Sequence, residues 1–206
     1  MKIIYKRRYD EIVSSVVETL EKVGSCRLPI SPLDIAWRLG IEVRKFSDVR
    51  ATERSRLLLL QKDGFSYRYQ KDKLSTSHFV IWYNDEMLEE RIRWTISHEL
   101  GHIVLKHLEE SELAEAEANY FAATLLAAPI FIMMLKLGST AEVQHILHLS
   151  AEAACNAMSR YYNRFENGPC LTQNERRLLQ LFQGNTALDN VETTGVSHFC
   201  DGIREL

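Results

Sequence analysis

The spacing of apolar positions predicts helices at both ends of the chain and strands between them. Apolar side chains recur every three or four residues over 8–23, which predicts an amphipathic helix. A second, short helix is predicted just before Gly40. Ser31 suits its N-cap and Pro32 its first position, while Gly40 suits the residue after its end.

Four stretches in the first half of the chain have the character of strands. Residues 41–46 alternate apolar and polar side chains, and residues 56–60 and 64–69 flank a turn at Lys-Asp-Gly. Residues 78–84 are the clearest strand, because they are rich in β-branched and aromatic side chains. With helices on either side, this order predicts an α+β domain with a small, mostly antiparallel sheet.

The second half of the chain is predicted to be helical. A long helix is expected over about 85–107, opened by Asn84 or Asp85. The next is expected from Ser111 to about Ala128, where Pro129 bends or ends it.

Further helices are predicted after Ser139 or Thr140, after Ser150 and over residues 172–182, with a loose tail at 184–206. We therefore expect a main domain at 1–166 and a C-terminal helix with its tail at 167–206.

The apolar run 120–137 needs separate treatment, because it could be a membrane span. It is shorter than the roughly 20 residues that a spanning helix needs, and Pro129 interrupts it. A buried core helix is the better interpretation.

Composition narrows the possible settings and partners. The net charge of −3 gives no electrostatic reason to expect nucleic-acid binding. A helix-turn-helix at 139–165 is disfavoured, since only Arg160 and Arg164 are basic there. The four cysteines form no C-x-x-C pair, and the first residues lack the apolar core of a signal peptide. A cytoplasmic protein with free thiols and no membrane partner is expected.

The most specific chemical signal is an H-E-x-x-H pattern. His98 and His102 are four residues apart in a predicted helix, so both imidazoles lie on one face and can bind one metal ion. Glu99 lies beside them, where it can accept a proton from a water molecule that zinc activates. Gly101 would allow a neighbouring chain to approach closely.

A catalytic zinc needs three protein ligands and an open position for water. A third histidine six residues after His102 would complete one arrangement, but that residue is Leu108. His107 is one position away, and we interpret it as a helix-end histidine favoured by the helix dipole.

The alternative takes a glutamate from the next helix, where the candidates are Glu109, Glu110, Glu112, Glu115 and Glu117. The apolar stripe of that helix consists of Ala114, Ala118, Phe121, Ala122 and Leu125. Glu115 lies about 60° from the centre of the stripe and Glu117 about 100°. Glu115 is therefore the best geometric choice, and Asn119, one turn later, can hydrogen-bond His98 or His102. Glu109, Glu110 and Glu112 are interpreted as a solvated face.

Two stretches resemble the ImmA/IrrE family of metallopeptidases: RWTISHELGHIVLKH at 93–107 and EAEANYFAATLLAAP at 115–129. SPLDIAWRLGIEV at 31–43 and IWYND at 81–85 are similar to other family segments, so the resemblance covers roughly 28–165. It implies a compact zinc peptidase domain with His98, His102 and Glu115 as ligands and Glu99 as the catalytic carboxylate.

The family resemblance also implies a biological role. Members are typically intracellular bacterial or phage proteins, and several are antirepressors that cut a helix-turn-helix repressor, which switches on a mobile element or a stress response. Two features depart from the family pattern. The link from His102 to Glu115 is short, and the part after about residue 166 is too small for a sensory domain.

The mechanism expected from these residues is hydrolysis of a peptide bond, with Glu99 moving the proton from water to the leaving amine. Four side chains are candidates for the donor that stabilises the oxyanion: Tyr83, Tyr120, His145 and His148. We expect the substrate to pair as an added strand with residues 78–84.

Two other readings stay open. One is a zinc-binding regulator that acts on a repressor by contact alone, and the other is a structural protein with a chance motif. The intact Glu99 argues against the first.

Overall fold

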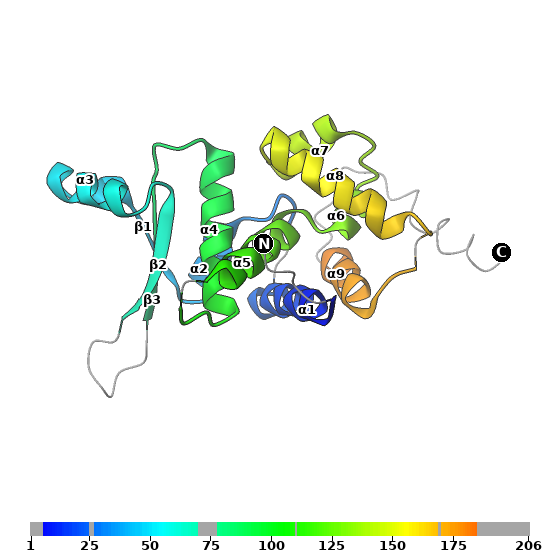
Figure 1. The fold of residues 1–206 in the computed structure, drawn as a ribbon. Coiled ribbons are helices and arrows are strands. Elements are labelled where there is room, and N and C mark those ends of the chain that lie inside the picture. Colours follow the sequence, from blue (N-terminus) through cyan, green and yellow to red (C-terminus); the bar gives the residue numbers. More distant parts are fainter. Residues whose placement is uncertain (1–5, 25–26, 70–77, 110, 169, 185–206) are drawn as a thin grey trace.

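A small sheet and a group of helices make up the protein (Figure 1). The computed structural model describes residues 6–24, 27–69, 78–109, 111–168 and 170–184. The sheet lies on one side, helix α4 (Glu89–Val104) packs against it, and α5 (Glu112–Ala127) packs against α4. The helices between Pro129 and Gly184, α6 to α9, gather on the side away from the sheet. The predicted α+β class is confirmed.

The sheet contains β1 (Glu42–Lys45), β2 (Gly64–Tyr69) and β3 (His78–Tyr83) in the order β1-β3-β2. The β2–β3 pairing is antiparallel over six residue pairs, and the β1–β3 pairing is parallel over four. Strand β3 is therefore central and paired on both sides, so the expectation that a substrate adds to residues 78–84 is wrong. A long run of β-branched and aromatic residues is typical of a central strand, because both of its faces are covered.

The prediction of a strand at residues 56–60 is also wrong. These residues form the second half of α3 (Ala51–Leu60), which follows the 3₁₀ turn η1 (Phe46–Asp48). Leu57 packs against the cluster of Phe46, Val80 and Trp82, whereas Leu59 is 87% exposed. A short apolar run does not distinguish strand from helix, and leucine has high helix propensity.

The N-terminal helices follow the predictions closely. Helix α1 spans Lys6–Val23 and α2 spans Pro32–Arg38. The Ser31 hydroxyl accepts a hydrogen bond from the backbone N–H of Asp34, which caps α2. Gly40 has a φ of 72°, the left-handed conformation expected of the residue that ends this helix.

Helix α4 (Glu89–Val104) begins later and ends earlier than predicted. Its N-cap is Leu88, because Asn84 has another role: its side-chain amide donates to the carbonyl of Lys62 and its oxygen accepts from the N–H of Glu86. Asn84 therefore fixes the turn after β3. The early end of α4 matters for the site described below.

The remaining helices agree with the capping signals. Helix α5 spans Glu112–Ala127, and Ser111 accepts from the N–H of Ala114 at its start. Pro129 begins α6 (Pro129–Met134). They are followed by α7 (Thr140–Leu147), α8 (Ala151–Phe165) and α9 (Gln173–Gly184). The predicted tail lies outside the described residues from 185 onward.

Helix α5 is central to the hydrophobic core. Its predicted stripe is buried, with Phe121 and Leu125 fully inaccessible. Among the described residues, one segment, Glu112–Met134, is long and apolar enough to cross a membrane by length and composition, and 67% of its apolar 18-residue window is buried within the protein. The interpretation of this run as a core helix is confirmed.

Candidate metal centre

Two histidines of α4 face the same side of the helix because they are one turn apart. The Nε2 atoms of His98 and His102 are 3.0 Å apart, and both side chains are mostly buried.

Close packing of α4 on α5 depends on Gly101. A Cβ atom at this position would lie 3.1 Å from Ala118 Cα, 3.2 Å from Ala118 O and 3.2 Å from Phe121 Cβ. The glycine and the alanine thus allow the two helices to touch along their backbones, as the small residues in the sequence led us to expect. This contact places the start of α5 beside the two histidines.

Glu115 reaches the histidines from α5. Its Oε2 lies 3.3 Å from His98 Nε2, and its Oε1 lies 3.2 Å from His102 Nε2. Ligand atoms about 2.0–2.1 Å from a tetrahedral metal ion are roughly 3.3 Å from one another. The three side chains therefore fit a tetrahedral ion such as zinc, with the fourth corner left for another ligand.

The hydrogen bond on the far side of the His98 ring indicates which of its nitrogens carries the proton. Nδ1 of His98 lies 3.0 Å from Asn119 Oδ1, so Nδ1 is the donor and Nε2 keeps its lone pair. Burial, with the neighbouring His98 and His107, lowers the pKa of His102 to about 4, so this ring is neutral at neutral pH. Two imidazole lone pairs and a carboxylate oxygen thus converge on one point, an arrangement that a cation stabilises.

Glu99 projects from α4 toward the sheet. Ser66 on β2 donates a hydrogen bond of 2.7 Å to Glu99 Oε2. Burial raises the pKa of Glu99, while the bond from Ser66 opposes that shift. Helix and strand approach closely here because of Gly64, where a Cβ atom would lie 2.6 Å from Thr95 Cγ2.

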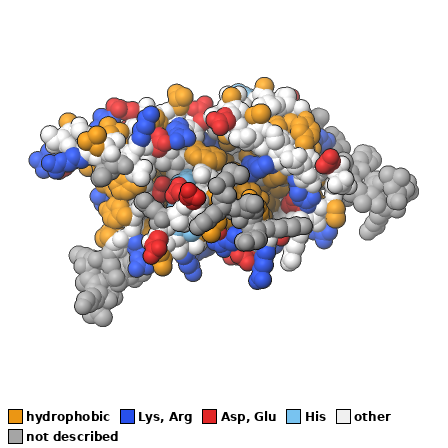
Figure 2. Space-filling model, viewed as in Figure 1, with side chains coloured by type: hydrophobic (Ala, Val, Ile, Leu, Met, Phe, Trp, Pro, Cys, Tyr) orange, Lys and Arg blue, Asp and Glu red, His pale blue; other side chains and the backbone are white. Residues whose placement is uncertain are grey.

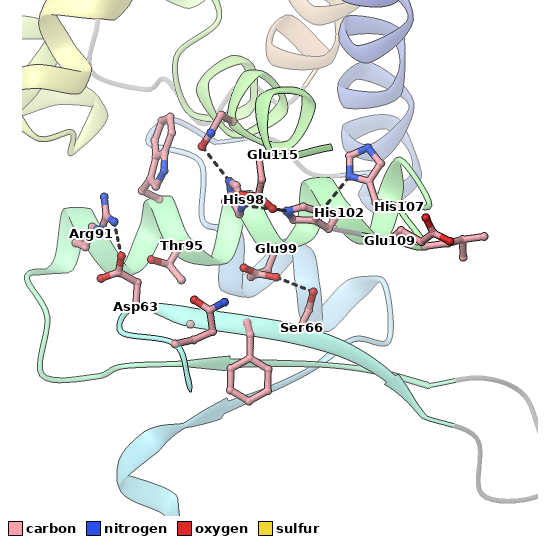
Figure 3. A pocket seen from close by; sticks show the side chains of 16 residues that line it. Asp63, Ser66, Arg91, Thr95, His98, Glu99, His102, His107, Glu109 and Glu115 are labelled. Atoms are coloured by element: carbon pink, nitrogen blue, oxygen red, sulfur yellow. Dashed lines mark hydrogen bonds and ion pairs between the residues drawn. The ribbon is translucent and has the colours of Figure 1, made fainter. Parts of the chain in front are cut away.

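The cluster opens into a cavity of about 480 Å³ (Figure 3). Its walls come from β2, α4, the turn after α4 and α5. Acidic and histidine side chains lie together near the centre of the face shown in Figure 2. The Glu115 side chain is half exposed, so the group is accessible to a ligand from solvent.

None of the four predicted oxyanion donors lines this cavity. Tyr83 is buried in the main core, and Tyr120 packs edge-on against Tyr9 with ring centroids 4.5 Å apart. His145 and His148 are exposed at the end of α7. Side chains with N–H donors that do line the cavity, apart from the histidines, are Gln61, Arg91, Trp94 and Asn119.

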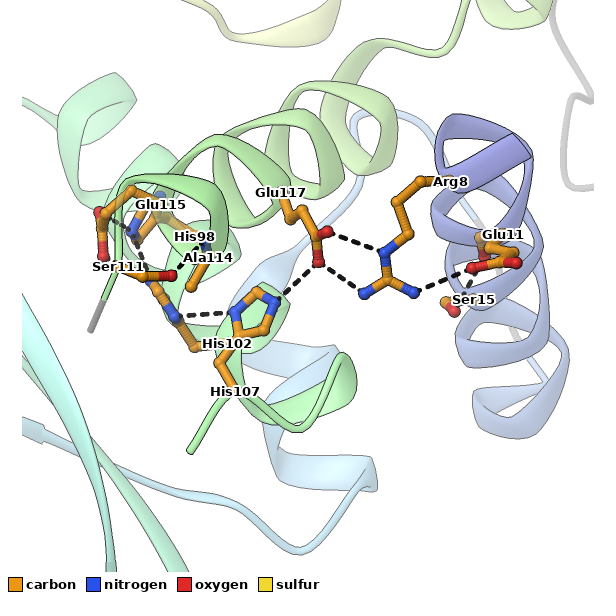
Figure 4. Close-up of polar contacts among 10 residues, drawn as sticks. All are labelled: Arg8, Glu11, Ser15, His98, His102, His107, Ser111, Ala114, Glu115 and Glu117. Atoms are coloured by element: carbon orange, nitrogen blue, oxygen red, sulfur yellow. Dashed lines mark hydrogen bonds and ion pairs between the residues drawn. The ribbon is translucent and has the colours of Figure 1, made fainter. Parts of the chain in front are cut away.

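The interpretation of His107 as an ordinary helix-end residue is wrong. Its Nδ1 lies 3.1 Å from His102 Nδ1, and its Nε2 lies 3.1 Å from Glu117 Oε2 (Figure 4). The sequence predicted a continuous helix through His107, and in such a helix residues five apart are not on the same face, so this contact was not expected. Glu109 and Glu112 are exposed as predicted, and Glu110 lies outside the described residues.

Sequence comparison identifies the family. Residues 38–159, more than half of the chain, match the peptidase family described as the IrrE N-terminal-like domain. A search of curated proteins found no match. The matched range contains the two histidines, Glu99 and Glu115. The chain therefore belongs to the IrrE N-terminal-like peptidase family, in agreement with the resemblance in its motifs.

Proposed function

We propose that the protein is a zinc-dependent endopeptidase. The observation that carries this proposal is the convergence of His98, His102 and Glu115 on one point, with Glu99 beside them in an open cavity. Two imidazoles and one carboxylate are a ligand set typical of catalytic zinc, which keeps one position open.

Glu99 is the residue that moves protons in this proposal. A bound zinc ion would polarise a peptide carbonyl and lower the pKa of a water molecule. Glu99 accepts the proton of that water and gives it to the amine that leaves. The burial that raises the pKa of Glu99 favours this exchange, because a carboxylate with an ordinary pKa holds a proton weakly at neutral pH.

The substrate binds in an extended form along β2. This strand is at the edge of the described sheet, and Gly64, Phe65 and Ser66 line the cavity. The outer edge of β2 offers backbone N–H and C=O groups to a further strand. A peptide there would pass beside Glu99, since Ser66 contacts that carboxylate.

The substrate that we propose is a helix-turn-helix transcriptional repressor, which would make the protein an antirepressor. Support for this part comes from the family resemblance of the motifs. The net charge of −3 is in keeping with a protein partner and with no direct contact to nucleic acid.

The proposal is tested by mixing the purified full chain with candidate repressors encoded near it, with and without a zinc chelator. A defined cut is expected that the chelator abolishes. Glu99→Gln should stop cleavage and leave zinc binding intact. Glu112→Gln is the matched control, because Glu112 is an exposed glutamate at the start of α5 that is not among the residues lining the cavity.

Two results would overturn the proposal. Cleavage that survives both the chelator and Glu99→Gln would exclude the mechanism. Inactivation of a repressor by Glu99→Gln without any cut would instead favour a regulator that acts by contact.

A further inference from the structure

We propose that His107, Glu117 and Arg8 are positioning residues that hold His102 in the orientation and tautomer needed to bind the metal ion. This inference rests on the proposed metal site and extends it to a helix at the start of the chain. Its basis is a continuous row of polar contacts from α4 through α5 to α1 (Figure 4).

The contacts run in sequence without a gap. His102 Nδ1 lies 3.1 Å from His107 Nδ1, and His107 Nε2 lies 3.1 Å from Glu117 Oε2. Arg8 donates two hydrogen bonds to the same carboxylate, from Nε to Oε1 at 2.8 Å and from Nη2 to Oε2 at 2.5 Å. A guanidinium that binds both oxygens fixes the carboxylate plane as well as its position.

The donor and acceptor of each hydrogen bond follow from Glu117, whose carboxylate is paired with Arg8. A carboxylate paired with arginine accepts hydrogen bonds, so His107 must donate from Nε2 to Glu117. In the singly protonated form of His107 the lone pair is then on Nδ1, which accepts from Nδ1–H of His102. His102 is left with its lone pair on Nε2, the atom that faces His98 and Glu115.

The turn after α4 creates the first contact. Lys106 has a φ of 58°, its N–H bonds to the carbonyl of Ile103, and the N–H of His107 bonds to the carbonyl of His102. These are the two bonds of a Schellman motif, which brings the second residue past the helix end back over the last turn.

A Schellman motif also ends α6, but there it brings apolar side chains together. Lys136 has a φ of 54°, and the N–H of Leu137 bonds to the carbonyl of Ile132. There the two residues brought together are apolar and belong to one hydrophobic cluster, as is usual for this motif. After α4 the two residues at the same positions are His107 and His102. Their polar contact therefore replaces the hydrophobic contact that usually accompanies this motif.

Burial indicates that the row is more than a surface ion pair. The side chains of Glu117 and His107 are 6% and 11% exposed. A carboxylate removed from water requires compensating partners, and Arg8 and His107 supply them. Arg8 precedes the family-matched range of 38–159, so the geometry of the site depends on a helix outside that range.

The test measures zinc affinity of the full chain by competition with a chromogenic chelator. His107→Phe keeps a flat ring and removes the acceptor for His102, so zinc binding should weaken about 10–100-fold. Glu117→Gln and Arg8→Ala should weaken it by smaller factors. Arg7→Ala is the matched control on the same helix, because Arg7 is 92% exposed and pairs only with Glu11 across one turn in the described contacts. It should leave the affinity unchanged.

A second readout separates positioning from simple stabilisation. Nitrogen-15 NMR of the histidine rings in the metal-free protein should show His102 protonated on Nδ1 and His107 on Nε2. Glu117→Gln and Arg8→Ala should reduce the population of these tautomers.

The proposal is overturned if folded His107→Phe binds zinc within twofold of the unsubstituted chain, or if His102 carries its proton on Nε2. A loss of melting temperature without a change in zinc affinity would also overturn it, since that is the result of a purely structural contact. A chain that binds no zinc at all would refute the proposed function, and the tautomers of His102 and His107 would still decide the positioning role.

Discussion

Ser66 on β2 donates a 2.7 Å hydrogen bond to Glu99 on α4 and so connects the sheet edge to the carboxylate beside the candidate metal ligands. The bond links the strand on which we place the substrate to the group that we expect to move protons. It also holds a buried carboxylate in one orientation, which a polar partner at this distance does effectively.

Replacing Ser66 by alanine should therefore slow cleavage. The hydrogen bond is made to a charged group, and its loss should raise the activation free energy by about 1.4 kcal/mol. That increase would lower kcat roughly tenfold. KM should change little, because the hydroxyl contacts Glu99 and the substrate pairs with the backbone. Steady-state kinetics on a cleaved peptide measures both constants. Ser55→Ala is the control, since Ser55 is exposed on α3 and bonds only to the carbonyl of Ala51 among the contacts described. An unchanged kcat would remove Ser66 from the mechanism.

Zinc should stabilise the folded protein. An ion that binds only the folded state at a free concentration of about 100 times its Kd adds about 2.7 kcal/mol to the free energy of unfolding. The metal-free chain should remain folded, because its core does not include the ligands. Glu115→Gln should abolish most of the rise in melting temperature, measured by calorimetry, while Glu112→Gln should preserve it. Equal shifts in both variants would show that Glu115 is not a ligand.

The sequence predicted those parts of the fold that depend on local signals. Capping by Ser31 and Ser111, the left-handed Gly40 and the helix break at Pro129 each depend on residues close together in the chain. The choice of Glu115 needed only the 100° rotation per residue of α5, and the structure places this residue beside both histidines.

Features that depend on distant or unusual contacts could not be predicted in the same way. The strand order, which makes β3 central and β2 the edge, depends on pairing between separate segments. The contact of His107 with His102 requires a left-handed backbone at Lys106, a residue that seldom adopts it. The partner of Glu117 comes from 109 positions earlier, at Arg8.

Gly101→Ala should damage both stability and the candidate site. The added methyl group would meet backbone atoms of Ala118 at 3.1 and 3.2 Å, and backbone has little freedom to move away. Overpacking of this kind costs about 1–3 kcal/mol, more than alanine gains over glycine inside a helix. The displaced α5 would also draw Glu115 away from the histidines and weaken zinc binding.

The control for this substitution is Gly138→Ala. The nearest atom to a Cβ at Gly138 is Glu142 Oε2 at 3.9 Å, which is ordinary contact. Urea unfolding and zinc competition should both show a large effect for Gly101→Ala and almost none for Gly138→Ala. Equal unfolding free energies for the two variants would contradict the close approach of α4 and α5.

The ion pair of Glu21 and Arg177 should make stability depend on pH. Arg177 on α9 binds both oxygens of Glu21 on α1, at 2.8 and 2.5 Å, and this hydrogen bonding lowers the pKa of Glu21. A carboxylate with a lowered pKa in the folded state stabilises it above the unfolded pKa of about 4.3, and the contribution is lost as pH falls through the folded value. Arg177→Ala should therefore melt at a lower temperature than the unsubstituted chain at pH 7. The difference in melting temperature should shrink as pH falls below about 4.

The control is Arg176→Ala, which removes the same charge from an exposed position on α9. The difference in melting temperature between this variant and the unsubstituted chain should not change with pH in this way. Melting curves for the three proteins between pH 3 and pH 7, values set by the same linkage argument, decide the question. A difference in melting temperature for Arg177→Ala that stays constant across that range would show that Arg177 does not lower the pKa of Glu21.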